Sequence, residues 1–181
     1  MLKITIPEGE LFNEETQEII TCKEQTIQLE HSLVSLSKWE SKWHKSFLEH
    51  IKELTPEEST DYVRCMTITQ NVDPNVYMFL SNDNMKEIND YINNPMTATT
   101  FNEEKTSSGK KEIITSEVLY YDMIALNIPF ECQKWHLNRL MTLIKVCDIK
   151  SQPPKKMGRK ATINHYAALN AARRKQLNSK G

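Results

Sequence analysis

The two residues whose spacing best suits metal chemistry are Cys132 and His136. Four residues apart on a predicted helix, their thiolate and imidazole would share one face and could supply two ligands to a zinc ion. A structural zinc site also needs a second close pair of cysteines or histidines, and the sequence offers no such companion. We therefore predict a core thiol and a half-buried histidine here, and no metal site.

Residues suited to catalysis are also sparse. The chain has four glycines, and they form neither G-x-x-x-x-G-K-[ST] nor G-x-G-x-x-G, so no nucleotide cofactor is expected. Asp122 interrupts the apolar segment YYDMIAL, where a buried carboxylate would need a partner. We expect it to face water or a lysine. A catalytic carboxylate would need a second acid or a base, which the sequence does not identify. We predict a protein that is not an enzyme and holds no cofactor.

The largest apolar side chains follow Ser37 at the spacing of one helix face. This stripe consists of Trp39, Trp43, Phe47, Ile51 and Leu54. One interpretation is that the stripe seals its helix onto the core of the domain. The other is that part of it stays exposed and binds another molecule, because tryptophan is enriched at binding hot spots.

The elements that must position these residues begin with short β-type runs. Alternating apolar residues at Leu2–Ile6, then Ile19–Ile20 and Thr26–Leu29, predict a small antiparallel sheet. We expect the third run to continue towards Leu36. Ser37 and Glu40 fit a capping box, which predicts that the helix carrying the stripe begins there.

Further helix starts follow along the chain. The sequence Thr55-Pro56-Glu57-Glu58 predicts a helix that buries Tyr62, Val63 and Met66, and Asp73-Pro74 and Ser81 predict two more starts. Ser116 opens another helix, for which we expect Val118, Leu119, Ile124 and Leu126 to point inward. The longest helix is predicted from about Phe130 to Ile149, before Pro153-Pro154 ends the compact region.

These elements predict an α+β protein in three parts. A small N-terminal antiparallel β-sheet covers residues 1–36, a mainly α-helical domain covers 37–150, and a basic C-terminal tail covers 151–181. The tail has helix-favouring composition but few apolar residues, so we expect a marginal helix, or disorder, that orders on a surface.

Charge divides the chain in the same way. The tail carries eight basic residues and no acidic one, which leaves 15 basic against 24 acidic residues in the body. Such a tail could bind nucleic acid through its phosphates, but the body is acidic and the tail has one aromatic residue, Tyr166, so nucleic acid is not the expected partner. An acidic protein surface is the alternative partner, and a solvated tail without a partner is a third interpretation.

The bulk composition places further bounds on the protein. With 181 residues, 39% hydrophobic and 26% charged, it has the composition of a globular protein, and we expect neither a membrane span nor a secretory signal. The cysteines at 22, 65, 132 and 147 form no C-x-x-C pair. Free buried thiols in a reducing cytosol are therefore expected.

Four stretches in the same order resemble the tail assembly chaperones of tailed bacteriophages and prophages, and together they cover much of the chain. They are HSLVSLSKWESKWHKSFL, DYVRCMTITQNVDPNVY, YYDMIALNIPFECQKWHLNRLMTLIKVC and PPKKMGRKATINHYAALNAARRKQLNSKG. The family has an aromatic residue where Asp122 stands here, so the chain departs from the pattern at that helix.

The resemblance implies a role without catalysis in the host cytoplasm. Such chaperones bind the tape-measure protein, keep it soluble, help to recruit tail-tube subunits and are generally absent from the finished virion; we also expect self-association. A minor structural virion protein, such as a tail-completion or connector component, is the alternative. The residues that we predict to contact the client are Trp39, Trp43, Phe47 and Trp135. Those that we predict to dock it electrostatically are Lys155, Lys156, Arg159, Arg173, Arg174 and Lys175.

Overall fold

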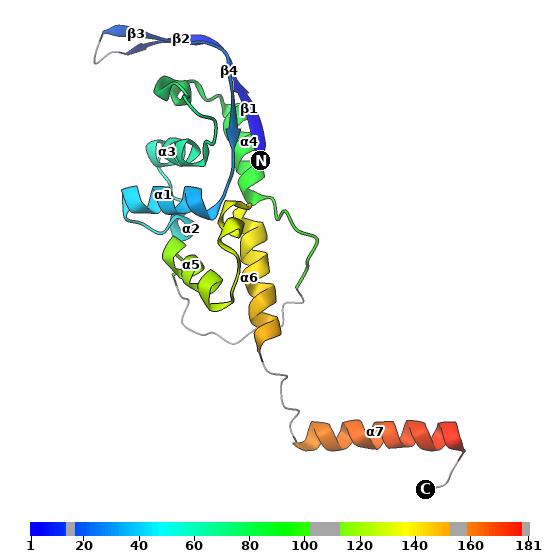
Figure 1. The fold of residues 1–181 in the computed structure, drawn as a ribbon. Coiled ribbons are helices and arrows are strands. Elements are labelled where there is room, and N and C mark those ends of the chain that lie inside the picture. The colour runs from blue at the N-terminus through cyan, green and yellow to red at the C-terminus, as the bar shows by residue number, and fades with distance from the viewer. Residues whose placement is uncertain (14–16, 102–112, 153–158, 179–181) are drawn as a thin grey trace. The chain divides into compact units, whose positions relative to one another are not determined.

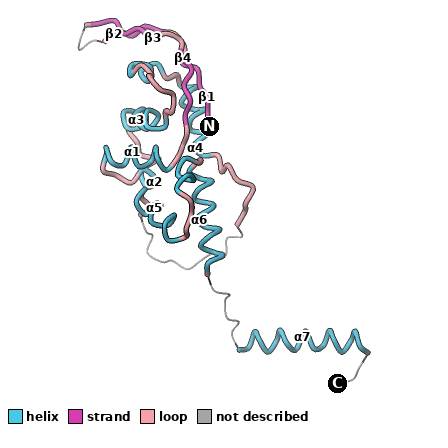
Figure 2. Tube along the Cα trace, in the orientation of Figure 1, coloured by secondary structure: helices cyan, strands magenta, loops and turns pink. Residues whose placement is uncertain are grey.

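The computed structural model describes residues 1–13, 17–101, 113–152 and 159–178 (Figures 1 and 2). The chain divides into two compact units, Met1–Ile149 and Lys150–Gly181, and each is described by itself. The first unit contains both the strands and most of the helices. The predicted α+β class, with a small antiparallel N-terminal part followed by mostly helical structure, is confirmed.

The first four elements form one long β-hairpin in two halves. They are β1 (Leu2–Ile6), β2 (Gly9–Asn13), β3 (Glu18–Cys22) and β4 (Gln25–Leu29). β1 pairs with β4 and β2 with β3, both antiparallel. The two halves keep the same pairing register because two residues separate them on each side of the hairpin. These residues are Pro7–Glu8 and Lys23–Glu24. Proline has no amide hydrogen for the ladder, which accounts for a break at this point.

The two halves of the hairpin have different environments. In the inner half, Ile4, Ile6, Ile27 and Leu29 are buried in the core, as their alternation predicts. The outer half, β2 with β3, extends past the helices (Figure 1), and we call it the β2–β3 arm. The expectation that the last strand continues towards Leu36 is wrong, since β4 ends at Leu29.

Helix α1 (Leu33–Trp43) begins five residues earlier than the sequence predicts, with Ser32 in place of Ser37 as its N-cap. Its capping box is formed by Ser32 and Ser35, so the assignment of this role to Ser37 and Glu40 is wrong. Serine can replace glutamate here because its hydroxyl accepts the hydrogen bond from the Ser32 amide at 2.9 Å.

The expected continuous helix from Ser37 to Leu54 is also wrong. Helix α1 ends at Trp43, with His44 as its C-cap in a left-handed backbone conformation with φ of 53°, and the short helix α2 (Phe47–His50) follows. The buried carboxylate of Glu40 stabilises this break. It accepts hydrogen bonds from the Phe47 amide at 3.0 Å and, far along the chain, from the Ser116 amide at 2.7 Å.

The next helices begin where the sequence predicts. Helix α3 (Pro56–Met66) has Thr55 as N-cap in a capping box with Glu58, the 3-10 helix η1 spans Pro74–Phe79, and helix α4 (Asn82–Asn93) begins after Ser81. The predicted burial of Tyr62, Val63 and Met66 is confirmed. The residues after Met66 pair with β4 through hydrogen bonds from Glu30 N to Met66 O and from Ile68 N to Gln28 O, both at 2.9 Å.

The last elements of the first unit differ from the prediction in two ways. They are α5 (Ser116–Ala125), η2 (Phe130–Lys134) and α6 (Leu137–Ser151), the last of which ends in the second unit. The predicted single helix from Phe130 to Ile149 is wrong, because η2 and α6 are separated at Trp135. Ile124 is 60% exposed, so its expected inward position is wrong, and Met123 is buried in its place.

The second unit contains helix α7 (Arg159–Leu177). Its apolar side chains are exposed within this unit, among them Ile163, Tyr166 and Leu177. The helical alternative for the tail is therefore the one that the structure contains.

Candidate interaction surface

The tryptophans of the predicted stripe divide between core and surface. Trp39 is fully buried, and its Nε1–H donates to the carbonyl of Glu58 at 3.0 Å. Phe47 is 1% exposed and meets Trp39 edge to face with ring centroids 5.2 Å apart. Both side chains are therefore core, as the first interpretation predicts. Their assignment as direct client contacts does not fit this burial, because a partner cannot reach them.

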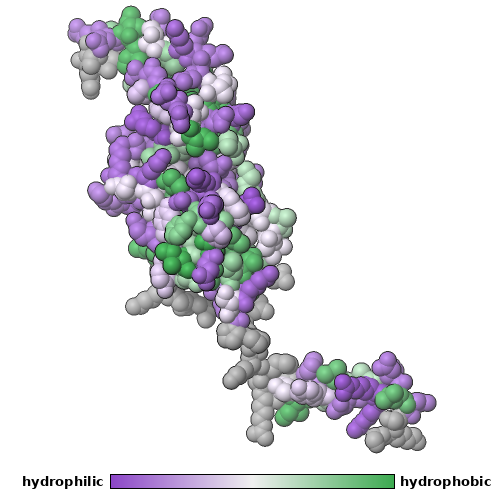
Figure 3. Space-filling view, viewed as in Figure 1, coloured by the Kyte–Doolittle hydropathy of each residue, from purple (hydrophilic) through white to green (hydrophobic). Residues whose placement is uncertain are grey.

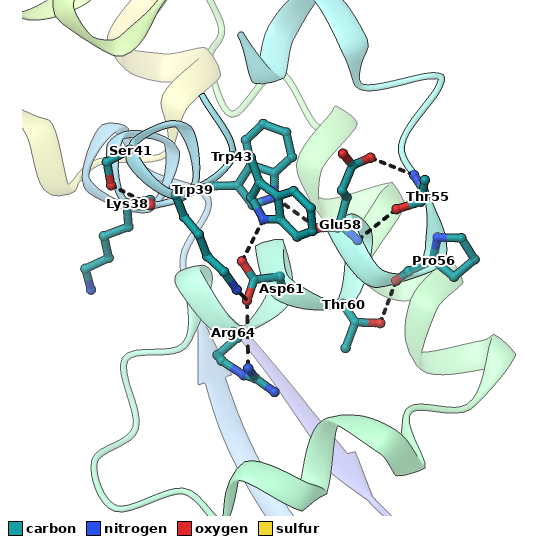
Figure 4. Close-up of polar contacts among 11 residues, drawn as sticks. Lys38, Trp39, Ser41, Trp43, Thr55, Pro56, Glu58, Thr60, Asp61 and Arg64 are labelled. Atoms are coloured by element: carbon teal, nitrogen blue, oxygen red, sulfur yellow. Dashed lines mark hydrogen bonds and ion pairs between the residues drawn. The ribbon is translucent and has the colours of Figure 1, made fainter. Parts of the chain in front are cut away.

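Trp43 is half-buried at the edge of the same cluster (Figure 4). Its ring stacks on Trp39 with centroids 6.1 Å apart, and its Nε1–H donates to Asp61 Oδ2 at 2.9 Å. The other oxygen of Asp61 accepts from Lys42 at 2.6 Å, and Arg64 lies 3.8 Å away. The indole is thus fixed from two sides, by stacking and by a hydrogen bond to a charged group.

The charges around Trp43 are internally paired. Burial alone would raise the pKa of Asp61, but hydrogen bonds from Lys42 and Trp43 and the charges of Lys42 and Arg64 outweigh it, so the pKa lies below its usual value. The hydrogen bond from Lys45 lowers the pKa of Glu58 in the same direction. A carboxylate held ionised in this way is a poor general base, because it gives up its partners when it takes a proton. The hydrogen bonds and ion pairs of Asp61 therefore fix the positions of Trp43, Lys42 and Arg64 at the surface.

An open groove of about 780 Å³ borders this cluster. Helix α3 forms one wall, and the rest of the lining comes from η1, the start of α4, the β2–β3 arm, Lys42 of α1 and Leu54, so we call it the α3 groove. Its apolar lining comes from Leu11, Leu54, Tyr77, Met78, Leu80 and Met85. Met78 is 54% exposed, and methionine adapts its shape to different partners.

A second groove of about 720 Å³ lies between α5 and α6, and we call it the α5–α6 groove. Val118, Leu126, Met141 and Ile144 give it apolar walls. Hydrophobic residues also show on the surface over α5 and α6 in Figure 3. Asp122 is half-buried in this groove, which Lys145 also lines.

The structure places Cys132 and His136, the candidate metal ligands, in two different segments. Cys132 lies in η2 and His136 beyond it, so they do not share a helix face. His136 Nε2–H donates to the carbonyl of Tyr91 at 3.0 Å, and the ring is buried against His31. Within the described residues, no three or more His, Cys, Asp and Glu side chains gather to hold a metal ion.

Burial also shifts the pKa values of His31 and Cys65 away from neutral pH. His31 is 2% exposed and its Nδ1 is 2.6 Å from the hydroxyl of Tyr62. Burial, with a smaller contribution from His136, lowers the pKa of His31 to about 3. Burial likewise raises the pKa of Cys65 to about 11, so its thiol remains protonated at neutral pH. Both side chains are therefore uncharged at neutral pH.

The other predicted docking residues differ in position. Trp135 is half-buried under the guanidinium of Arg139, whose central carbon is 4.1 Å from the ring centroid. Lys155 and Lys156 lie outside the described residues. Arg159 begins α7, and the basic run near its end is exposed. The members of that run are Arg173, Arg174 and Lys175.

The sequence did not single out three strongly exposed apolar side chains of the body. Phe12 and Ile19, which face each other in the β2–β3 arm, are 63% and 65% exposed. Tyr121 on α5 is 68% exposed. The apolar residues of the helix that carries Tyr121 are spread around its axis. Such a helix is normally buried on all sides, so this pattern could have indicated an exposed apolar side chain.

Comparison with known protein families, with curated proteins and with solved structures gave no match. Among the described residues, no helix is long and apolar enough to span a membrane.

Proposed function

We propose that this chain is a tail assembly chaperone of a tailed bacteriophage, acting without catalysis in the host cytoplasm. Its client would be the tape-measure protein, and it would help to recruit tail-tube subunits around that client. The order of the four resembling stretches along the chain supports the family. The α3 groove is the observation that supports binding of an extended helical client.

The groove has the lining that such a client needs. An amphipathic helix binds by placing apolar side chains of successive turns into an apolar groove. Leucine and methionine side chains from four separate segments line the α3 groove, and flexible side chains of this kind tolerate differences in sequence along a client. A chaperone that holds many helices of one long protein needs that tolerance.

The groove wall is also held in position before binding. Lys42 and Arg64 contribute to the lining and both contact Asp61, which in turn holds Trp43. A preformed wall reduces the ordering cost of association. The charged residues of the lining contribute attraction that salt screens. The contact with the client should therefore be weak enough for tube subunits to displace the chain during assembly.

Co-expression with the tape-measure protein encoded in the same genome tests this proposal. We expect the tape-measure protein to stay soluble and to co-purify with the intact chain. Met78→Lys should reduce the recovered client at least about tenfold, since it places a charge in the groove. Ile68→Lys is the matched control, because Ile68 is 47% exposed and does not line the α3 groove.

Two results would contradict the proposal. One is a client that aggregates equally with and without the chain. The other is the chain in stoichiometric amounts in purified particles, which would favour the alternative of a tail-completion or connector component. Equal loss of client in both lysine variants would show that the α3 groove is not the binding surface.

A further inference from the structure

Helix α5 is a surface helix without a polar face. Leu119 and Met123 point into the core, yet Tyr121 and Ile124 on the other side are 68% and 60% exposed. A helix whose apolar residues surround its axis normally lies inside a protein. Tyr121 also lines the α5–α6 groove, whereas Ile124 does not. The helix therefore presents an uncovered apolar side next to a groove.

The partly covered side of α6 continues this surface. Leu137 and Leu140 near its start are fully buried, but Met141, Ile144 and Cys147 are only half-buried. Asp122 and Asp148 give the groove two carboxylates against the single ammonium of Lys145. An occupant should therefore combine an apolar stripe with positive charge.

Helix α7 has these properties. Ile163, Tyr166 and Leu177 recur at intervals that place them on one face, and they are 58%, 60% and 75% exposed. Its 19 residues include no acidic side chain, and the basic residues on it are Arg159, Lys160, Arg173, Arg174 and Lys175. A helix of this composition gains most of its stability from packing against a surface.

We propose that α7 of one molecule binds in the α5–α6 groove of a second copy of this chain. The charge of the tail is complementary to that of the body. Residues 1–150 contain 24 acidic and 15 basic residues, whereas residues 151–181 contain eight basic residues and no acidic one. The contact joins two different surfaces, so it is heterologous and leaves a free groove and a free helix on each pair. This inference concerns a different groove and does not depend on the proposed client.

The test measures self-association of the full-length chain by sedimentation velocity. We expect mass to rise with concentration in about 50 mM salt and to fall towards the monomer in about 500 mM salt, where charges are screened within a few ångströms. Tyr121→Lys should weaken association at least about tenfold by adding a like charge to the groove. The control is Ile68→Lys, which adds the same charge at a 47% exposed isoleucine that does not line the α5–α6 groove, and it should associate as the wild type does.

A second pair of variants addresses the helix. Tyr166→Lys should weaken association as strongly as the groove variant, whereas Ala168→Lys adds the same charge to the opposite face of α7 and should not. Circular dichroism of all four variants checks that folding is retained. If Tyr166→Lys and Ala168→Lys weaken association equally, the apolar stripe is not the contact and the proposal fails.

Mixing the two defective variants gives the decisive result. Tyr121→Lys retains an intact helix and Tyr166→Lys an intact groove, so together they should form a one-to-one dimer that cannot grow further. Two molecules that exchange their helices reciprocally would also regain one contact on mixing, but their wild type would stop at the dimer, whereas the heterologous contact lets the wild type grow beyond it. No heterodimer on mixing, or a wild-type chain that stays monomeric in low salt, would overturn the proposal and assign the groove to a different protein.

Discussion

Glu40 connects three helices through one buried carboxylate, which makes it the most informative position for a stability measurement. It is 7% exposed, and its two oxygens accept from the amides of Phe47 and Ser116. Hydrogen bonds to a charged group contribute about 1.5–3 kcal/mol each. Glu40→Ala leaves both amides without their acceptor, so we expect a loss of about 3–5 kcal/mol in the free energy of unfolding.

The isosteric variant separates the two bonds. Glu40→Gln keeps one oxygen acceptor but turns an NH₂ group towards the other amide, so the loss should be about half as large, near 2 kcal/mol. Glu53→Gln is the control, because this carboxylate is exposed in the turn after α2, and we expect a change within about 0.5 kcal/mol. Urea unfolding followed by tryptophan fluorescence is a suitable assay, since all three tryptophans lie in the first unit.

The result that would refute this reasoning is a small loss for Glu40→Ala. A change below about 1 kcal/mol would mean that water or another group replaces the carboxylate at both amides, because unsatisfied buried amides cost more than that. A Glu40→Gln variant as unstable as Glu40→Ala would show that the charge, rather than the count of acceptors, holds the helices together.

Three further predictions concern pH, packing and capping. Burial lowers the pKa of His31 to about 3 in the folded state, so between about pH 6.5 and pH 3 the unfolded state binds more protons than the folded state. The free energy of unfolding should therefore be highest above about pH 6.5 and fall by about 1.4 kcal/mol per pH unit within this window. Urea unfolding between pH 7 and 5 should show this slope, and the slope should become smaller in His31→Asn, where the buried His136, whose pKa is also lowered by burial, still contributes. Trp39→Ala should cost about 3–5 kcal/mol and Trp135→Ala, half-buried, less than half as much in the same assay. Thr55→Ala should cost about 1 kcal/mol through loss of the α3 cap, measured as a shift in thermal midpoint; no shift would mean that this capping bond adds nothing.

The sequence predicted an element correctly where the residues that determine it are close together in the chain. Thr55 followed by proline and Glu58 defines the start of α3, because the cap and the returning glutamate are neighbours in the chain. The strand pattern of Ile4 and Ile6 was equally informative, since alternation reflects burial of one face. These features depend on residues within a few positions of one another.

Long-range contacts explain the errors. The stripe from Trp39 to Leu54 has helical spacing throughout, yet the chain turns at His44 because Glu40 binds an amide after the turn and another one 76 residues away. No local pattern contains that second partner. Ile124 was misplaced for a related reason, because its helix has apolar residues on all sides and the sequence alone does not say which side meets the core.

The matched two-residue interruption of the hairpin restricts how this region can evolve. A residue gained or lost on one strand alone would put β2 and β3 out of step with β1 and β4, and every side chain beyond the change would turn to the opposite face. Homologous chains should therefore vary in arm length only by compensated changes, with an indel in one strand accompanied by another in its partner, or by changes confined to the connecting tip.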